Sequence, residues 1–319
     1  MKGLRNVVFS MIVIVILLIL IAYTGKLFNP KWTDRALEAV EAFHSLPEES
    51  VEVVIYGSSH AWKGVETTEM YEKYGINAYN YGGNWQHINT TALFVKDSLR
   101  TQTPSIALVE TYRANAVLED SDLNGEIYYT KKIGIFKDKY KYLRQCFGDR
   151  LERYFSYYFP LVAFHGNWGN LEEENFDKNN AVDFFLGNRG YESSERTAIA
   201  VIKNYKDFKQ YELSDDAVST LNDIVSACRK RGIEVIFFTV PYEGEYNYID
   251  AMKRYAEANN CIYLNLFEKI DDIGIDGNTD FRDIDHLNDS GAKKVADYLG
   301  GYIRKNYNVA DERKLQDNM

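Results

Sequence analysis

Short apolar runs alternate with helical patterns along most of the chain. Runs rich in β-branched and other apolar residues predict strands at 51–56, 77–81, 105–110 and 233–239. Strands that alternate with helices indicate a parallel sheet whose two faces are covered by helices. We therefore expect an α/β fold with three α/β/α layers and a mostly parallel sheet.

Helices are marked by the spacing of their apolar residues and by signals at their ends. One is expected from about residue 33 to 46, before the first strand. A second has Ser214 as its N-cap and Gly232 just after its end. The last is a terminal helix capped by Asn288 or Ser290. Its apolar stripe consists of Ala292, Val295, Ala296, Leu299 and Ile303.

The amino-terminal segment 7–23 is an uncharged apolar run, VVFSMIVIVILLILIAY. At about 1.5 Å per helical residue this run nearly crosses the hydrocarbon core of a bilayer. A cleaved signal peptide would have a shorter apolar run and a small-x-small site, for which 22–24 is a poor match. We predict an uncleaved membrane anchor at residues 1–26.

Basic residues flank both ends of this anchor. Lys2, Arg5 and the terminal amine favour an amino end inside the cell. The basic residues that follow the anchor are Lys26, Lys31 and Arg35. Although the two counts nearly balance, we place the body of the chain, residues 27–319, outside the cytoplasm of a single-pass cell-membrane protein.

The strand pattern is lost between about residues 116 and 211. This stretch is rich in aromatic residues, notably in YFSYYFPLVAFHGNW at 154–168. We interpret it as a helical, aromatic-rich insertion in one extracytoplasmic domain, 27–319, rather than as a second domain.

Composition limits the partners and cofactors. With 45% apolar and 26% charged residues the chain is globular, and its net charge of −10 disfavours a nucleic acid as partner. The cysteines Cys146, Cys228 and Cys261 form no CxxC pair. Neither a zinc cage nor a disulfide framework is therefore indicated.

The turn after the first predicted strand is the first candidate for chemistry. Its sequence, GSSH at 57–60, places a hydroxyl where the backbone N–H groups of the next helix can stabilise an oxyanion. By itself this match is weak, because serine is common in turns.

The second candidate lies directly before the terminal helix. Asp283, three residues ahead of His286, can bind one imidazole nitrogen and hold the other toward a serine. The ordinary interpretation is that Asp283, Asp285 and His286 are solvated surface groups. A metal-dependent phosphoesterase built on the same residues is a further alternative, although no other ligands are evident at strand ends.

Together these blocks resemble the SGNH, or GDSL-type, hydrolase superfamily. The first block corresponds to 57–59, with Ser59 in the place of the nucleophile. The last block corresponds to Asp283 and His286 in the pattern DxxHLNxxG at 283–291. The resemblance implies a flavodoxin-like sheet and a catalytic set of Ser59, Asp283 and His286.

The resemblance also implies an oxyanion hole, formed by Ser59, Gly83 and Asn115. The sequence YNYGG at 79–83 is similar to the second block, in which a glycine N–H contributes; Gly83 is the first choice and Gly82 the second. The third block departs from the usual GxND, because the third strand runs into VETYRAN and its asparagine comes late.

The anchor, the GSS variant and the aromatic insertion are similar to membrane-attached members such as the D-alanyl-lipoteichoic acid biosynthesis protein DltD and proteins of polysaccharide O-acetylation. They imply an esterase or O-acyltransferase that acts on acyl esters of cell-envelope polysaccharide or teichoic acid through an acyl-Ser59, with no metal or organic cofactor. The implied partners are a cell-surface glycan or acylated polymer and a membrane-bound O-acyltransferase. A catalytically silent glycan-binding or assembly factor for such an acyltransferase is the alternative, which the irregular third block favours.

Overall fold

A parallel sheet forms the centre of the protein. The computed structural model describes residues 2–28, 39–115, 130–134, 136–171, 173–176 and 204–313. Within these residues the sheet has five strands, all parallel, in the order β2-β1-β3-β4-β5. The strands are β1 (Val53–Tyr56), β2 (Ala78–Asn80), β3 (Ile106–Glu110), β4 (Glu234–Thr239) and β5 (Ile262–Asn265). The predicted α/β class is confirmed.

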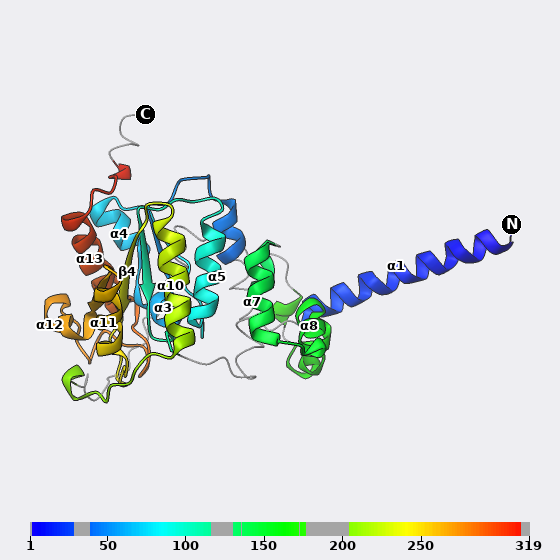
Figure 1. The fold of residues 1–319 in the computed structure, drawn as a ribbon. Helices are drawn as coiled ribbons and strands as arrows, with labels where there is room; N and C mark the ends of the chain where they lie inside the picture. The colour runs from blue at the N-terminus through cyan, green and yellow to red at the C-terminus, as the bar shows by residue number, and fades with distance from the viewer. Residues whose placement is uncertain are drawn as a thin grey trace.

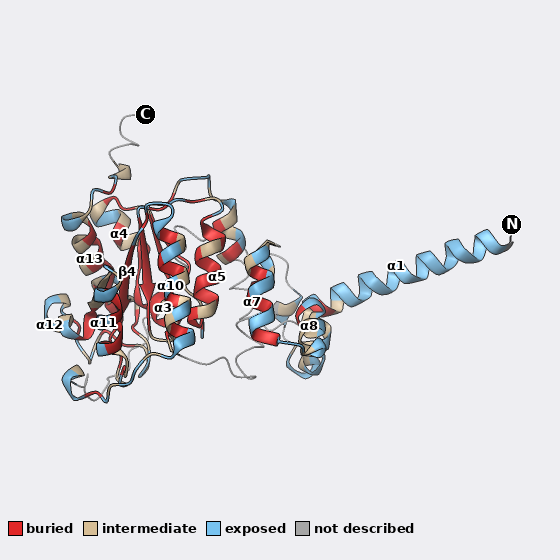
Figure 2. Cartoon of the chain, viewed as in Figure 1, coloured by how far each residue is buried: buried red, intermediate tan, exposed pale blue. Residues whose placement is uncertain are grey.

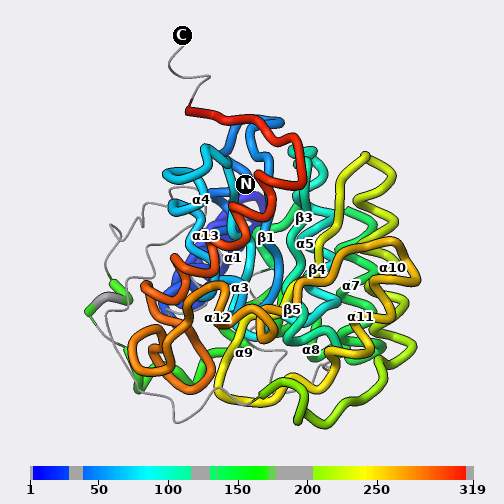
Figure 3. The backbone as a smooth tube through the Cα atoms, turned by 90° about the vertical axis from the view of Figure 1, so that its left-hand side faces the viewer, coloured from blue at the N-terminus to red at the C-terminus, as the bar shows by residue number. Residues whose placement is uncertain are grey.

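Helices cover both faces of this sheet (Figure 1). One face carries α3 (Ser59–Gly64), α4 (Thr67–Tyr74) and α13 (Asp289–Asn306). The other carries α5 (Ile88–Ser98), α10 (Asp215–Arg229) and α11 (Ile249–Ala258). A short helix, α12 (Ile270–Ile273), follows β5. Figure 3 shows the same layers after a quarter turn.

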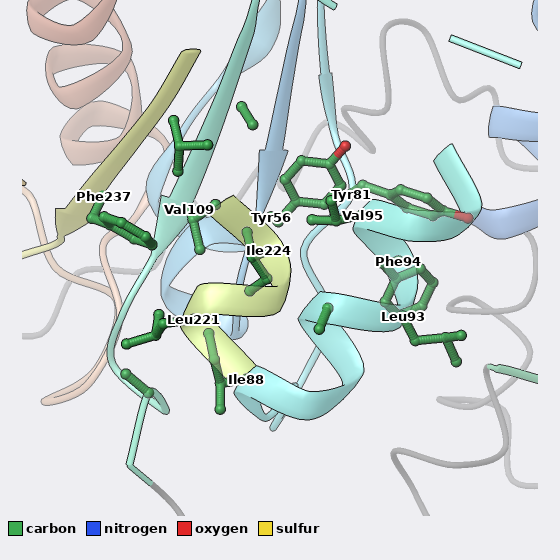
Figure 4. Close-up of a cluster of buried hydrophobic side chains, with 14 of the residues drawn as sticks. Tyr56, Tyr81, Ile88, Leu93, Phe94, Val95, Val109, Leu221, Ile224 and Phe237 are labelled. Carbon is green, nitrogen blue, oxygen red and sulfur yellow. The ribbon is translucent and has the colours of Figure 1, made fainter. Parts of the chain in front are cut away.

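The core sits between the sheet and these helices. Because side chains alternate along a strand, Val53 and Ile55 of β1 face one helical layer while Val54 and Tyr56 face the other. Strands β1, β2 and β3 are buried throughout, and β4 is buried after its first residue (Figure 2), which explains their continuous apolar runs. On the α5 and α10 side, Leu221 and other apolar residues pack against the strands (Figure 4).

Two predicted helix starts are confirmed by their hydrogen bonds. The Ser214 hydroxyl accepts the Ala217 N–H of α10 at 3.2 Å. Asn288, rather than Ser290, caps α13, because its side-chain oxygen accepts the Gly291 N–H at 3.2 Å.

The start of the first predicted helix, near residue 33, lies outside the described residues. Residues 39–45 are helical, and Val40 and Phe43 are buried as the pattern indicates. Strand β5 was not predicted; three of its four residues are only half-buried at the sheet edge, so the sequence lacks a clear apolar run there.

The amino-terminal helix α1 (Lys2–Phe28) projects away from the sheet (Figure 1). By length and composition it is able to cross a membrane, and its apolar residues from Leu4 to Tyr23 are exposed. The helix continues two residues beyond the predicted anchor boundary at 26 and ends against the aromatic-rich segment.

The described part of the predicted insertion is helical. It contains α7 (Lys137–Phe147), α8 (Leu151–Tyr158) and α9 (Pro160–Phe164), followed by a 3-10 helix, η2 (His165–Asn170). Helix α7 packs on α5, where the Tyr142 and Thr90 hydroxyls lie 2.7 Å apart in a buried hydrogen bond. Residues 116–129 and 177–203 of the insertion lie outside the described residues.

Candidate active site

The strand order reverses at the carboxyl end of β1. Strand β2 lies on one side of β1 and β3 on the other, so the order of the strands reverses between β1 and β3. Ligands of open α/β sheets bind at such a reversal, outside the carboxyl ends of the strands. The GSSH turn follows β1 at this point.

Ser59 is the first residue of α3. The Ser58 side chain caps this helix by accepting the His60 N–H at 3.2 Å. The Ser58 carbonyl accepts the N–H groups of Ala61 and Trp62. The Ser59 amide has no partner within the helix, because the first N–H groups of a helix find no carbonyl one turn earlier. The turn therefore holds both the hydroxyl and the backbone N–H of Ser59 at the carboxyl end of β1.

Gly57 lets the GSSH turn, residues 57–60, approach β3 closely. Its φ of +144° lies in a region that residues with a side chain rarely adopt. A Cβ at this position would stand 2.6 Å from the Cβ of Glu110, at the end of β3. Only glycine fits the backbone here without displacing one of the two strands.

Glu110 binds this turn through hydrogen bonds from Ser58. Its Oε2 accepts the Ser58 N–H at 3.1 Å and the Ser58 hydroxyl at 2.7 Å, and its Oε1 accepts the Tyr112 N–H. Glu110 lies in none of the motifs found in the sequence. A carboxylate at the end of a buried strand is nevertheless a signal that the residue holds or serves a functional site. Glu110 is a positioning residue, since it contacts Ser58 and not Ser59.

The stability of the fold is expected to depend on the charge of Glu110. Burial raises its pKa from 4.5 to about 7, against hydrogen bonds from Ser58 and Tyr112 that lower it. A carboxyl whose pKa is higher in the folded state contributes stability below its unfolded pKa, and this is lost as pH rises through the folded pKa. Between pH 4.5 and 7 the loss should approach about 3 kcal/mol.

This expectation is checked by chemical unfolding of the full chain in detergent at pH 5 and pH 8. The Glu110→Gln variant should lose the pH-dependent step, whatever its absolute stability, because the amide does not titrate. An equal pH step in the parent and in Glu110→Gln would assign the step to another group.

The loop before α13 carries His286 to the turn that follows β1. Leu287 is buried and pairs with Phe281 in an antiparallel bridge, while Asn288 binds the Thr279 carbonyl at 2.7 Å. Gly291 leaves room for the Asp280 carbonyl, which a Cβ would strike. The LNxxG part of the motif therefore builds the turn that orients His286.

Ser59, His286 and Asp283 form a continuous hydrogen-bonded set. The Nε2 atom of His286 lies 2.9 Å from the Ser59 Oγ. The Nδ1 atom lies 2.9 Å from Asp283 Oδ1 and 3.1 Å from Oδ2. Asp283 Oδ1 also accepts the backbone N–H groups of Asp285 and His286, each at 2.9 Å. Residues separated by most of the chain thus meet as the sequence predicts.

The surroundings keep His286 neutral and Asp283 charged. Burial lowers the pKa of His286 below 6.5, the charge of Lys63 lowers it further, and Asp283 acts in the opposite direction. Burial alone would raise the pKa of Asp283, but the neighbouring imidazole of His286 and hydrogen bonds from His286 and the Asp285 N–H lower it overall. A neutral imidazole next to a carboxylate is the form that can accept a proton from serine.

Lys63 is expected to influence the pH at which kcat/KM falls on the acidic side of the pH profile, called here the acidic limb. Its positive charge disfavours protonated His286, so Lys63→Gln should raise the pKa of His286 and move the acidic limb of kcat/KM to higher pH. The measurement is a pH profile of ester hydrolysis. Lys230→Gln, which changes an exposed lysine at the end of α10, is the matched control and should leave the limb in place. A limb that moves to lower pH in Lys63→Gln would contradict this role.

Packed aromatic rings form a wall beside His286. Buried His60 stacks on Tyr112 with ring centroids 3.9 Å apart and meets Tyr242 edge-on at 4.9 Å. The His60 ring also lies 5.6 Å from that of His286. Burial holds the pKa of His60 well below 6.5, so its ring stays neutral at pH 7. This wall excludes water from one side of the imidazole pair.

Of the predicted oxyanion donors, the Gly83 amide is engaged elsewhere in this structure, and Asn115 is held beside α10 through its side-chain oxygen, not through its N–H groups. The Gly83 N–H donates to the Gly57 carbonyl at 3.0 Å, and the Gly82 N–H donates to the Asn80 side chain at 3.1 Å. The Asn115 side-chain oxygen accepts the Ser214 N–H at 2.6 Å, next to α10. The roles of Ser59, Gly83 and Asn115 as oxyanion donors stay predictions.

The acidic residues near His286 do not form a metal centre by their arrangement. Across the described ranges, no group of three or more His, Cys, Asp or Glu side chains is placed to hold a metal ion. The Asp283 carboxylate instead accepts hydrogen bonds from His286 and from backbone N–H groups. Cys146, Cys228 and Cys261 form no disulfide in the described part of the chain.

Comparisons with known proteins give little further guidance. No protein-family model matches the chain, and no curated protein matches it. Among solved structures, the chain is similar to a crystal structure described as a "putative acylhydrolase" from Bacteroides fragilis. The two are 11% identical with a TM-score of 0.42, and the match covers 87% of this chain and 99% of the other. Function is therefore inferred from the geometry of the site.

Proposed function

We propose that the chain is a membrane-anchored SGNH-type serine esterase or O-acyltransferase. The observation that carries this proposal is the 2.9 Å hydrogen bond between Ser59 Oγ and His286 Nε2, with Asp283 on the other imidazole nitrogen. A hydroxyl, a base and an orienting carboxylate in this order are the elements of nucleophilic acyl transfer.

The proposed reaction has two steps. His286 Nε2 takes the Ser59 proton as Oγ attacks the ester carbonyl, and the leaving alcohol then takes that proton from His286. The product is an acyl-Ser59 ester. In the second step His286 removes a proton from water or a sugar hydroxyl, which attacks the acyl group. The departing Ser59 Oγ then takes that proton from His286, so both residues return to their starting forms. Asp283 stabilises the imidazolium in both steps.

The proposed substrates are acyl esters of cell-envelope polysaccharide or teichoic acid. An anchor long enough to cross a membrane supports a surface substrate. Trp85, 61% exposed in the segment that follows β2, adds a flat apolar face of the kind that packs on sugar rings, backed by Arg113 at 5.0 Å. A membrane-bound O-acyltransferase is the proposed donor of acyl groups or partner.

The two outcomes of the reaction are separated by product analysis. The full chain in detergent is given 4-nitrophenyl acetate with and without an oligosaccharide acceptor, and nitrophenol, acetate and acetylated sugar are measured. Acetylated sugar identifies a transferase, and acetate alone identifies an esterase. Ser59→Ala should release nitrophenol only at the background rate. Equal release by the parent and Ser59→Ala would contradict the proposal.

A catalytically silent assembly factor is the second candidate. It is favoured by the hydrogen bond that engages the Gly83 N–H and by the irregular third block, since each missing oxyanion donor can lower the rate on the order of 100-fold. If the chain is only a scaffold, cells carrying Ser59→Ala should O-acetylate their envelope polymers as the parent does. If it is the enzyme, that acetylation should fall to the level of a deletion strain.

We also propose that the body of the chain lies outside the cytoplasm, where the substrate is. Protease added to intact cells from which any outer barrier has been removed should then degrade the sheet domain and spare only α1. A body that stays intact until the membrane is permeabilised would contradict this orientation.

A further inference from the structure

Large apolar side chains are exposed on the described part of the insertion, beside the end of α1. On α8, Leu151, Phe155 and Tyr158 recur at helical spacing on one face, whereas Tyr157 on another face is buried. We name this set the aromatic stripe. Its residues are Leu151, Phe155, Tyr158, Phe159, Val162, Trp168 and Phe176, exposed by between 45% and 71%. Patches of this kind on a folded protein mark an interaction surface.

The stripe is attached to the carboxyl end of α1. Gly25 of α1 is buried against α9, where a Cβ would stand 3.5 Å from the Leu161 nitrogen. The Asn167 side chain donates to the Phe28 carbonyl at 3.0 Å, and that of Asn175 donates to the Leu27 carbonyl at 3.2 Å. These amides satisfy the last carbonyls of α1, which have no partner within the helix.

The position of α1 in a bilayer would fix the depth of the stripe. The apolar run 7–23 is about 26 Å long at 1.5 Å per residue, which nearly fills a hydrocarbon core. The end of α1 and the residues bound to it then lie at the boundary between acyl chains and headgroups. Exposed Trp and Tyr side chains are most stable at this depth, because their rings are apolar and their polar atoms reach water.

We propose that the aromatic stripe lies in the membrane interface and binds the boundary between headgroups and acyl chains next to α1. The charge pattern supports lipid as the occupant, since residues 154–171 contain no Asp, Glu, Lys or Arg. Continuity with α1 supports it as well, because the stripe begins where the bilayer-spanning helix ends (Figure 1).

This contact would set the height of the active site above the membrane. The stripe is joined to α7, and α7 is joined to α5 of the sheet domain through the buried Tyr142–Thr90 hydrogen bond. Thr130 and Tyr157 add a second buried hydrogen bond of 3.0 Å under α8. The insertion thus connects the membrane surface to the catalytic domain through packed helices rather than through α1 alone.

The test uses the native tryptophan of the stripe. The full chain is reconstituted in phosphatidylcholine and phosphatidylglycerol vesicles whose acyl chains carry bromine near the headgroup, and Trp fluorescence is compared with that in unbrominated vesicles. Trp168, 71% exposed, should be quenched by the bromine, so Trp168→Phe should lose much of the quenching of the parent. Trp85→Phe, which removes a tryptophan 61% exposed outside the stripe, is the matched control and should keep it.

Two results would overturn the proposal. One is quenching that is equal in the parent and Trp168→Phe; the stripe then faces water, a partner protein or a second copy. The other is quenching that Trp85→Phe lowers as much as Trp168→Phe does. Resistance of the bound chain to alkaline carbonate extraction is measured on the same vesicles and shows that α1 is inserted. Ester hydrolysis plays no part in the readout, so failure here and failure of the proposed reaction are distinguishable.

Discussion

Replacing Ser59 by alanine is expected to lower kcat/KM for a small acetyl ester on the order of 10⁴-fold. The Ser59 oxygen is the atom that would form the acyl bond, and it lies 2.9 Å from the base that would activate it. His286→Ala should cause a loss of similar size, because an unactivated hydroxyl is a weak nucleophile at neutral pH. Initial rates with 4-nitrophenyl acetate measure both.

The pattern across variants is more specific than any single loss. Residues that act as one unit are not additive, so the Ser59→Ala and His286→Ala changes together should lower the rate little more than either alone. Asp283→Asn should lower it less, by about 10³-fold, since it orients the base without touching the substrate. Ser226→Ala, on the exposed side of α10, is the control and should match the parent. Additive losses would contradict a shared catalytic unit.

Replacing Gly57 by alanine is expected to destabilise the protein by about 4 kcal/mol, the sum of backbone strain at φ +144° and steric overlap with Glu110. That is a large part of the stability of an ordinary domain. Protein that still folds should also lose activity, because the overlap can be relieved only by moving the turn that holds Ser59. Chemical unfolding and ester turnover measure the two effects.

Gly232→Ala is the matched control for backbone strain. Gly232 follows α10 with φ +71°, and a Cβ there would meet nothing within 4 Å. This variant should lose only about 1 kcal/mol and keep full activity. If Gly57→Ala were no worse than Gly232→Ala, the close approach of the turn to Glu110 would have no energetic role.

Much of the fold can be predicted because its signals are local. The buried strands β1, β3 and β4 are continuous apolar runs, and α10 and α13 begin with the capping residues that the sequence shows. Strand β5 escapes prediction because it is short and only half-buried. In such an edge strand, tertiary contacts decide the structure and the local pattern does not.

The candidate site divides in the same way. Ser59 and His286 could be selected because each stands in a short motif, and the strand order then brings the two motifs together. A carboxylate at the end of a predicted strand marks Glu110, but its contact with Ser58 could not be predicted, since it depends on β3 lying directly beside β1 and on the backbone of Gly57. The donor positions Gly83 and Asn115 depend on loop geometry, which motif spacing alone does not determine.

The most direct test of the account is the site of covalent reaction with a fluorophosphonate, which reacts with serine hydroxyls activated by a base. The full chain is treated with the probe in detergent, digested, and the modified peptide is identified by mass spectrometry. The account predicts one modified residue, Ser59, and loss of the modification in His286→Ala protein that unfolds like the parent. A folded parent that stays unlabelled, or is labelled at another serine, would contradict it.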